Sequence, residues 1–130
     1  YEFTRALGNK GINLRALTLV DTGHFGELRV LVSDTATARQ ILMKKDIPAR
    51  VEDVVAVQME DKPGQLADLL ERLMEAGIKI KYGYALAGMD SGRAIMIFRF
   101  EDNDKAIETL IKQEVHLVDR ESFSKLAATG

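Results

Sequence analysis

The sequence predicts an α+β protein built from two copies of one β-α-β-β-α-β unit, with the first strand missing from the first copy. Two observations lead to this prediction. The tetrapeptides Gly11-Ile12-Asn13-Leu14 and Gly77-Ile78-Lys79-Ile80, 66 positions apart, each end a helical pattern of apolar residues and begin a strand pattern. The same order of apolar runs, turn glycines and capping residues continues after both, and such self-similarity indicates an internal repeat.

The first copy begins inside a helix. Phe3 and Leu7 lie at helical spacing, and Gly11 is the expected C′ residue that ends this helix. Asp34 is the expected N-cap of a second helix, because its side chain can accept a hydrogen bond from the first turn. The expected elements are a strand over 12–20, a strand over 27–33, a helix from 34 to 45, and a short closing strand over 47–51, where Pro48 indicates a sheet edge or a strand start.

The second copy is complete. Residues 28–32 correspond to 94–98 at the 66-residue offset, and two inserted residues then bring Asp34 into correspondence with Asp102. At that offset the first strand of the first copy would begin about a dozen residues before Tyr1; truncation, disorder or a strand supplied by another chain would account for its absence. The expected elements of the second copy are a strand over 54–59, a helix over 63–76, strands over 78–86 and 93–100, a helix over 102–113, a closing strand over 115–118 and a last helix over 120–127.

Length and composition are compatible with two small domains, 1–52 and 53–130, each near the lower limit of independent stability. Hydrophobic residues make up 46% and charged residues 29% of the chain, and a net charge of -2 provides no basis for binding nucleic acid. No apolar run approaches the roughly 20 residues of a membrane span, and no signal-peptide pattern is present. Since the chain has no cysteine and needs no oxidising compartment, we expect a cytoplasmic protein without a membrane or nucleic-acid partner.

The strand over 93–100 is apolar on both faces. Met96 and Phe98 point to one side, and Ile95 and Ile97 point to the other. One face is expected to meet the helices, and the other to be covered by the sister repeat or by a second subunit. We therefore expect two repeats packed side by side, with a homodimer as a further level of assembly.

The residues that usually carry catalysis or metal binding do not form a recognisable group. His24 and His116 are isolated from each other and from other ligand types, and are expected as a turn residue and a half-buried strand residue. No serine stands in a nucleophile motif. Tyr82 and Tyr84 share one face of a strand and could stack on bases, but the chain lacks the basic surface of an RNA-binding protein. We expect no enzyme, no metal and no cofactor.

The segment Asp61-Lys62-Pro63-Gly64-Gln65-Leu66 joins a strand to a helix. Pro63 is expected in the first turn of the helix, where its missing N–H costs nothing, and Gly64 allows close approach to the backbone. The open N–H groups of that turn and the positive end of the helix dipole favour a carboxylate. The alternative is that the Pro-Gly pair only starts the helix.

These residues resemble an ACT domain. In that family an Asp or Asn, one further residue and Pro-Gly precede a helix that ends on Gly-Ile/Val-Asn. Residues 61–66 match the first half of this pattern, and Gly77-Ile78 match the Gly-Ile of the second half. Gly11-Ile12-Asn13 matches the whole second half. The whole chain resembles proteins made of two ACT repeats. The resemblance implies ferredoxin-like repeats and a non-catalytic regulatory module that binds a free amino acid between them.

The resemblance also implies which residues would bind that ligand. Asp61 would hold the α-ammonium, the helix-start N–H groups the α-carboxylate, and Asn13 would offer both a donor and an acceptor. Lys79 stands where Asn13 stands in the first copy, so a sister site is doubtful. The implied ligand-binding residues are Asp61, Lys62, Pro63, Gly64, Gln65 and Leu66, facing Gly11, Ile12, Asn13 and Leu14.

Two other hypotheses stay open. The first is a structural ACT paralogue that has lost its ligand and binds another protein. The second is a small ferredoxin-like enzyme or RNA-binding protein, which would need a catalytic group that the motifs do not reveal or an affinity for nucleic acid.

Overall fold

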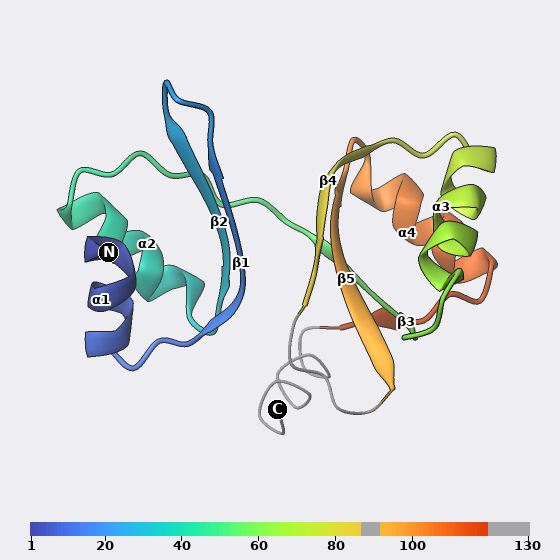
Figure 1. Ribbon diagram of the computed structural model, residues 1–130, viewed down its shortest axis with the longest axis horizontal. Helices are drawn as coiled ribbons and strands as arrows, with labels where there is room; N and C mark the ends of the chain where they lie inside the picture. Colours follow the sequence, from blue (N-terminus) through green and yellow to red (C-terminus); the bar gives the residue numbers. More distant parts are fainter. Residues whose placement is uncertain (87–91, 120–130) are drawn as a thin grey trace. The chain divides into compact units, whose positions relative to one another are not determined.

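The computed structural model describes residues 1–86 and 92–119, and divides into two compact units, Tyr1–Glu52 and Asp53–Gly130 (Figure 1). Each unit combines helices with an antiparallel sheet, which confirms the predicted α+β class. The helix predicted over 120–127 lies outside the described residues.

The first unit consists of two helices packed on a β-hairpin. Strands β1 and β2 pair antiparallel, and both helices lie on the same side of them (Figure 1). The core between the layers is small, with Leu7 as its most buried side chain and Phe3, Ile12, Ala38 and Ile41 around it. The elements are α1 (Glu2–Asn9), β1 (Leu14–Asp21), β2 (Gly26–Val32) and α2 (Thr35–Lys44).

The second unit has the complete β-α-β-β-α-β order. Its four strands form one antiparallel sheet in the order β4-β5-β3-β6, the ferredoxin-like arrangement predicted from the sequence. Helices α3 and α4 lie together at one side of the unit (Figure 1). The elements are β3 (Val55–Glu60), α3 (Gln65–Glu75), β4 (Ile80–Ala85), β5 (Arg93–Phe100), α4 (Asn103–Lys112) and β6 (Leu117–Val118).

Strand β5 runs through the centre of this sheet and is buried on both faces. Phe98 and Phe100 belong to the core that also contains the buried leucines of α3 and α4. Ile95 and Ile97 alternate with them, lie outside that core cluster and are fully buried as well. The prediction that both faces of this strand are covered is confirmed.

The four helices within the described residues end in the same way. In α1, the Ile12 N–H donates to the Leu7 carbonyl at 2.9 Å around Gly11 at φ +70°. In α3, the Ile78 N–H donates to the Leu73 carbonyl at 2.9 Å around Gly77 at φ +71°. This is the Schellman motif, with the left-handed residue at C′, and it confirms Gly11 as the end of the first helix. In α2 and α4 the left-handed residues are Asp46 and Glu114.

Strand pairing corrects the alignment of the two copies. Leu17 pairs with Val30 in the first hairpin, and Gly83 pairs with Phe98 in the second. Strands β1 and β4 therefore correspond at an offset of 66 residues, but β2 and β5 correspond at 68. The two inserted residues lie in the β4–β5 connection, not after the strand. The sequence did not reveal this, because a shift of two residues leaves every side chain on the same face.

The closing strand predicted over 47–51 is absent, and residues 47–54 form no strand. In the second unit β6 is held by β3, through pairs such as Ala56 with Val118. The first unit contains no strand equivalent to β3 among its described residues, so this segment has no partner for its backbone hydrogen bonds.

Candidate functional site

The corner between β3 and α3 is a tight turn followed by the helix. The Gln65 N–H donates to the Lys62 carbonyl at 3.2 Å, and Gly64 between them has φ +89° and ψ −15°. Proline at the second position and a left-handed glycine at the third are typical of a type II turn. The prediction that Pro63 lies in the first helical turn is wrong: Pro63 belongs to the turn, Gly64 is the N-cap and α3 begins at Gln65.

The first turn of α3 has no side-chain cap. The Asp68 N–H donates to the Gly64 carbonyl at 3.0 Å, while the N–H groups of Leu66 and Ala67 donate no hydrogen bond to any described residue. By contrast, α2 and α4 are capped by aspartates: Asp34 accepts from the Thr37 N–H and Asp102 from the Lys105 N–H, each at 3.1 Å. The start of α3 therefore presents two open donors at the positive end of a helix dipole.

The side chains around these donors are mostly exposed. The backbone N–H of Asp61 donates to the Gly92 carbonyl at 3.0 Å. The Asp61 carboxylate has no ion pair or hydrogen bond within the described part of the chain. Lys62 forms an exposed ion pair with Glu60, with Nζ and Oε2 3.0 Å apart. Leu66 is 41% exposed, although it belongs to the apolar side of the helix. The corner thus offers a carboxylate, two N–H donors and an apolar side chain.

In the first unit, the segment Gly11–Leu14 connects α1 to β1. The Asn13 N–H donates to Ser33 Oγ and the Asn13 carbonyl accepts from the Ser33 N–H, each at 3.0 Å, so the backbone is held while the amide side chain makes no hydrogen bond to a described residue. Ile12 is buried in the core of the unit and Leu14 packs against it. Among the four residues of this segment that the family resemblance implies as ligand-binding, Asn13 is the one with an exposed polar side chain.

The two histidines belong to different units of the chain. His24 is exposed in the β1–β2 turn, whereas His116 is exposed before β6, so the prediction of a half-buried strand histidine is wrong for it. No three potential metal ligands come together within residues 1–86 and 92–119. The rings of Tyr82 and Tyr84 stack, with centroids 6.4 Å apart and planes 5° from parallel.

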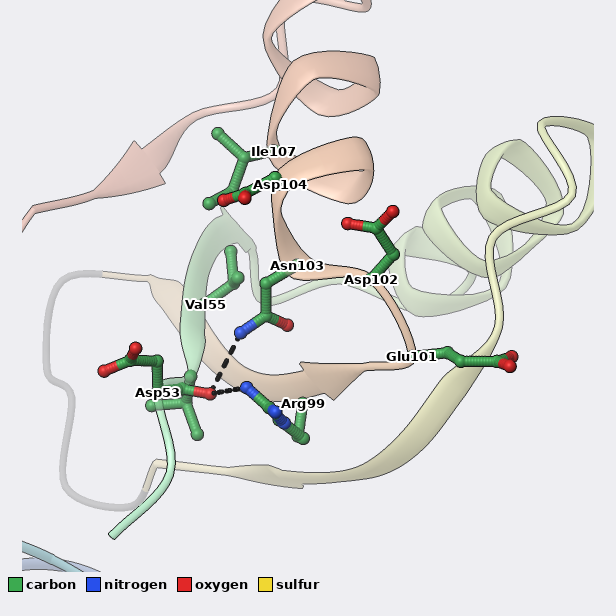
Figure 2. A pocket seen from close by; sticks show the side chains of 9 residues that line it. Asp53, Val55, Arg99, Glu101, Asp102, Asn103, Asp104 and Ile107 are labelled. Atoms are coloured by element: carbon green, nitrogen blue, oxygen red, sulfur yellow. Dashed lines mark hydrogen bonds between the residues drawn. The ribbon is translucent and has the colours of Figure 1, made fainter.

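A hollow of about 640 Å³ lies elsewhere in the second unit, where the connection from the first unit enters β3. Figure 2 shows Arg99 and Asn103 directed at the backbone of Asp53, with carboxylates around the rim. The Asp53 carbonyl accepts from Arg99 Nη1 at 2.9 Å and from Asn103 Nδ2 at 3.0 Å. Sequence reasoning missed this arrangement, because it treated the Asp102-Asn103 pair only as a helix start.

The comparisons with known proteins agree with this fold. The family model described as "ACT domain pair" matches residues 2–127. The chain is 34% identical to protein BT0572 from Bacteroides thetaiotaomicron, whose crystal structure it matches with a TM-score of 0.87, over 96% of this chain and 85% of that one. No curated protein matches at a significant level.

None of the helices in the described ranges has the length and hydropathy needed to cross a membrane. The family match covers nearly the entire chain and includes both units. This chain therefore belongs to the family of ACT domain pairs, whose domains are generally regulatory, often bind amino acids and are not themselves catalytic.

Proposed function

We propose that this protein is a sensor that binds a free amino acid between the corner at residues 61–66 and the segment at residues 11–14. The observation that supports this most strongly is the start of α3. It presents two N–H groups without partners among the described residues, while α2 and α4 carry aspartate caps. A helix start without a cap, at an exposed corner, is suited to a carboxylate from a ligand.

The groups at the corner match the two charges of an amino acid. The α-carboxylate would accept hydrogen bonds from the N–H groups of Leu66 and Ala67, which the helix dipole strengthens. The α-ammonium would donate to Asp61, whose carboxylate is exposed and has no other partner in the described part of the chain. The ligand side chain would then lie near Leu66, so size and apolarity of that side chain would set the preference.

A thermal-shift screen with the twenty amino acids tests the proposal. A ligand that binds the folded chain raises the melting temperature in proportion to the logarithm of its concentration above Kd. We expect at least one amino acid to do so, and its methyl ester and its deaminated analogue each to bind about tenfold or more weakly, since each loses a charge-assisted hydrogen bond. If no amino acid shifts the melting temperature, the proposal is wrong.

Matched variants locate the site. Asp61→Asn keeps the shape and removes the charge, and should weaken binding about tenfold or more. Asp104→Asn makes the same change in the first turn of α4, where it should leave the affinity unchanged. Equal affinity of Asp61→Asn and the unaltered chain would place the ligand elsewhere.

A second candidate function is protein binding, including pairing of two copies. Leu66, Leu70 and Met74 lie four residues apart along α3 and are 41%, 38% and 71% exposed, so they form an apolar row on the helix surface. If this row is an interface, Met74→Lys should lower the mass measured by light scattering without lowering the melting temperature. A chain that is monomeric at all concentrations would argue against pairing.

A further inference from the structure

Helices α2 and α3 carry opposite charges on their exposed surfaces. The charged residues of α2 are all basic, and a further lysine follows at its C-cap. Three of the four charged residues of α3 are acidic. All of these side chains are exposed: Arg39, Lys44 and Lys45 at α2, and Asp68, Glu71, Arg72 and Glu75 in α3.

The charges of these two helices are not paired within the chain. None of these side chains forms an ion pair or a hydrogen bond with another residue in the described ranges. Asp68 and Arg72 lie four residues apart, a spacing that allows an ion pair, but they do not form one. In α4, by contrast, Lys112 Nζ lies 3.1 Å from Glu108 Oε1. The charges of α2 and α3 are therefore available to a partner.

Each of the two helices also exposes apolar surface beside its charges. On α3 this surface is the row that includes Leu70, and on α2 it is Met43, which is 68% exposed. Glu71 follows Leu70 in the chain and Lys44 follows Met43, so each charge lies about 100° around the helix axis from its apolar neighbour. The two helices thus present the same arrangement, an apolar contact with a charge on one flank, and the two charges are opposite in sign.

We propose that α2 of one copy of this chain packs antiparallel on α3 of a second copy, with Met43 against the apolar row and Lys44 facing Glu71. In an antiparallel pair the corresponding flanks of the two helices meet, which brings the opposite charges together, and the helix dipoles also oppose each other. This inference rests on the second candidate function, pairing of two copies, and names the surface that the α3 row binds.

A twofold axis makes this contact occur twice in one dimer. Each copy contributes its α2 to one contact and its α3 to the other, so the interface is self-complementary. A stable interface buries roughly 1,200–2,000 Å² in total, a range that two helix contacts approach more closely than one. The opposite charges at the rim also favour this orientation over contacts that would bring two α3 helices together, because their acidic residues would repel.

Exchange of the two charges tests the contact. Lys44→Glu and Glu71→Lys each place like charges opposite each other in both contacts, and each should raise the dissociation constant of the dimer about tenfold or more. An equimolar mixture of the two variants should dimerise like the unaltered chain, because each contact again joins a base to an acid. Sedimentation velocity over a range of concentrations measures all three. The mixture also excludes misfolding as the cause, since mixing does not rescue a misfolded variant.

Lys112→Glu is the matched control, because Lys112 occupies in α4 the place that Lys44 has in α2 and the change of charge is the same. It should leave the dissociation constant unchanged. The proposal is overturned if the unaltered chain is monomeric at all concentrations, or if the mixture does not restore the dimer. If Met74→Lys separates the copies but neither charge variant does, α2 is not the partner of the row, and this inference fails while the second candidate function stands.

Discussion

Gly83 lies directly opposite Phe98 on the neighbouring strand, and the phenylalanine ring covers it. A Cβ atom at Gly83 would be 2.8 Å from Cδ1 and 3.0 Å from Cε1 of that ring, and 3.3 Å from the Ile97 carbonyl oxygen. Phe98 is only 2% exposed and belongs to the core of the second unit. In the first unit the same pair of positions holds Leu17 and Val30. The larger side chain of the pair therefore lies on the first strand of the hairpin in the first unit and on the second strand in the second unit.

Gly83→Ala should destabilise the second unit by about 1–2 kcal/mol, because the added methyl forces the ring out of its position. Urea denaturation followed by circular dichroism measures this change. Gly26→Ala is the control: its Cβ would be 3.9 Å from the nearest atom, the Val20 carbonyl oxygen, so the free energy of unfolding should change by less than about 0.5 kcal/mol. Equal losses in the two variants would show that Phe98 is not the cause.

Two glycines near the end of α1 should respond to alanine in opposite ways. Gly8 lies inside the helix with open space around it, so Gly8→Ala should stabilise the chain by about 0.5 kcal/mol through the unfolded state. Gly11 has φ +70°, so Gly11→Ala should destabilise it by about 1 kcal/mol. The measurement is the midpoint of thermal or urea unfolding. A stabilising Gly11→Ala would contradict the Schellman assignment.

Asp34 should make stability depend on pH in the acid range. Its hydrogen bonds from the Thr37 hydroxyl, first, and from the Thr37 N–H lower the pKa of the Asp34 carboxyl below its usual value of about 3.9. Since the folded pKa is the lower one, the contribution is complete above the unfolded value and is lost as the pH falls through the folded value.

The comparison that isolates this effect is with Asp34→Asn, which keeps an acceptor for the Thr37 N–H but does not titrate. Free energies of unfolding measured between pH 2 and pH 7 should show a difference between the two proteins that is constant above about pH 5 and shrinks below it. A difference that does not change with pH would exclude the carboxylate as its source.

At the proposed amino-acid site, binding of the ligand should depend on Asn13 more than on Lys79. Asn13→Lys replaces a neutral donor and acceptor with a cation, and should weaken binding of the amino acid about tenfold or more. Lys79→Asn should leave the affinity unchanged, because Lys79 occupies the sister position. Isothermal titration of both variants provides the measurement, and equal effects would remove Asn13 from the site.

The sequence by itself determined the features that depend on contacts within a few residues. The repeat was recognised from its glycine helix ends, and Gly11 proved to be the C′ residue it was predicted to be. Asp34 and Asp102 were predicted as helix starts and accept the capping hydrogen bonds from Thr37 and Lys105. Caps and Schellman ends form between residues three to five apart, so the local sequence contains all the atoms that they need.

Only the tertiary structure decided the features that need a distant partner. Whether residues 47–51 form a strand depends on a neighbouring strand, and the 68-residue offset of β2 and β5 is visible only in the pairing of each hairpin. The hydrogen bonds from Arg99 and Asn103 to Asp53 join residues 46 and 50 positions apart. Such contacts are chosen by how the sheet and helices pack, and residue patterns along one stretch of chain do not contain that information.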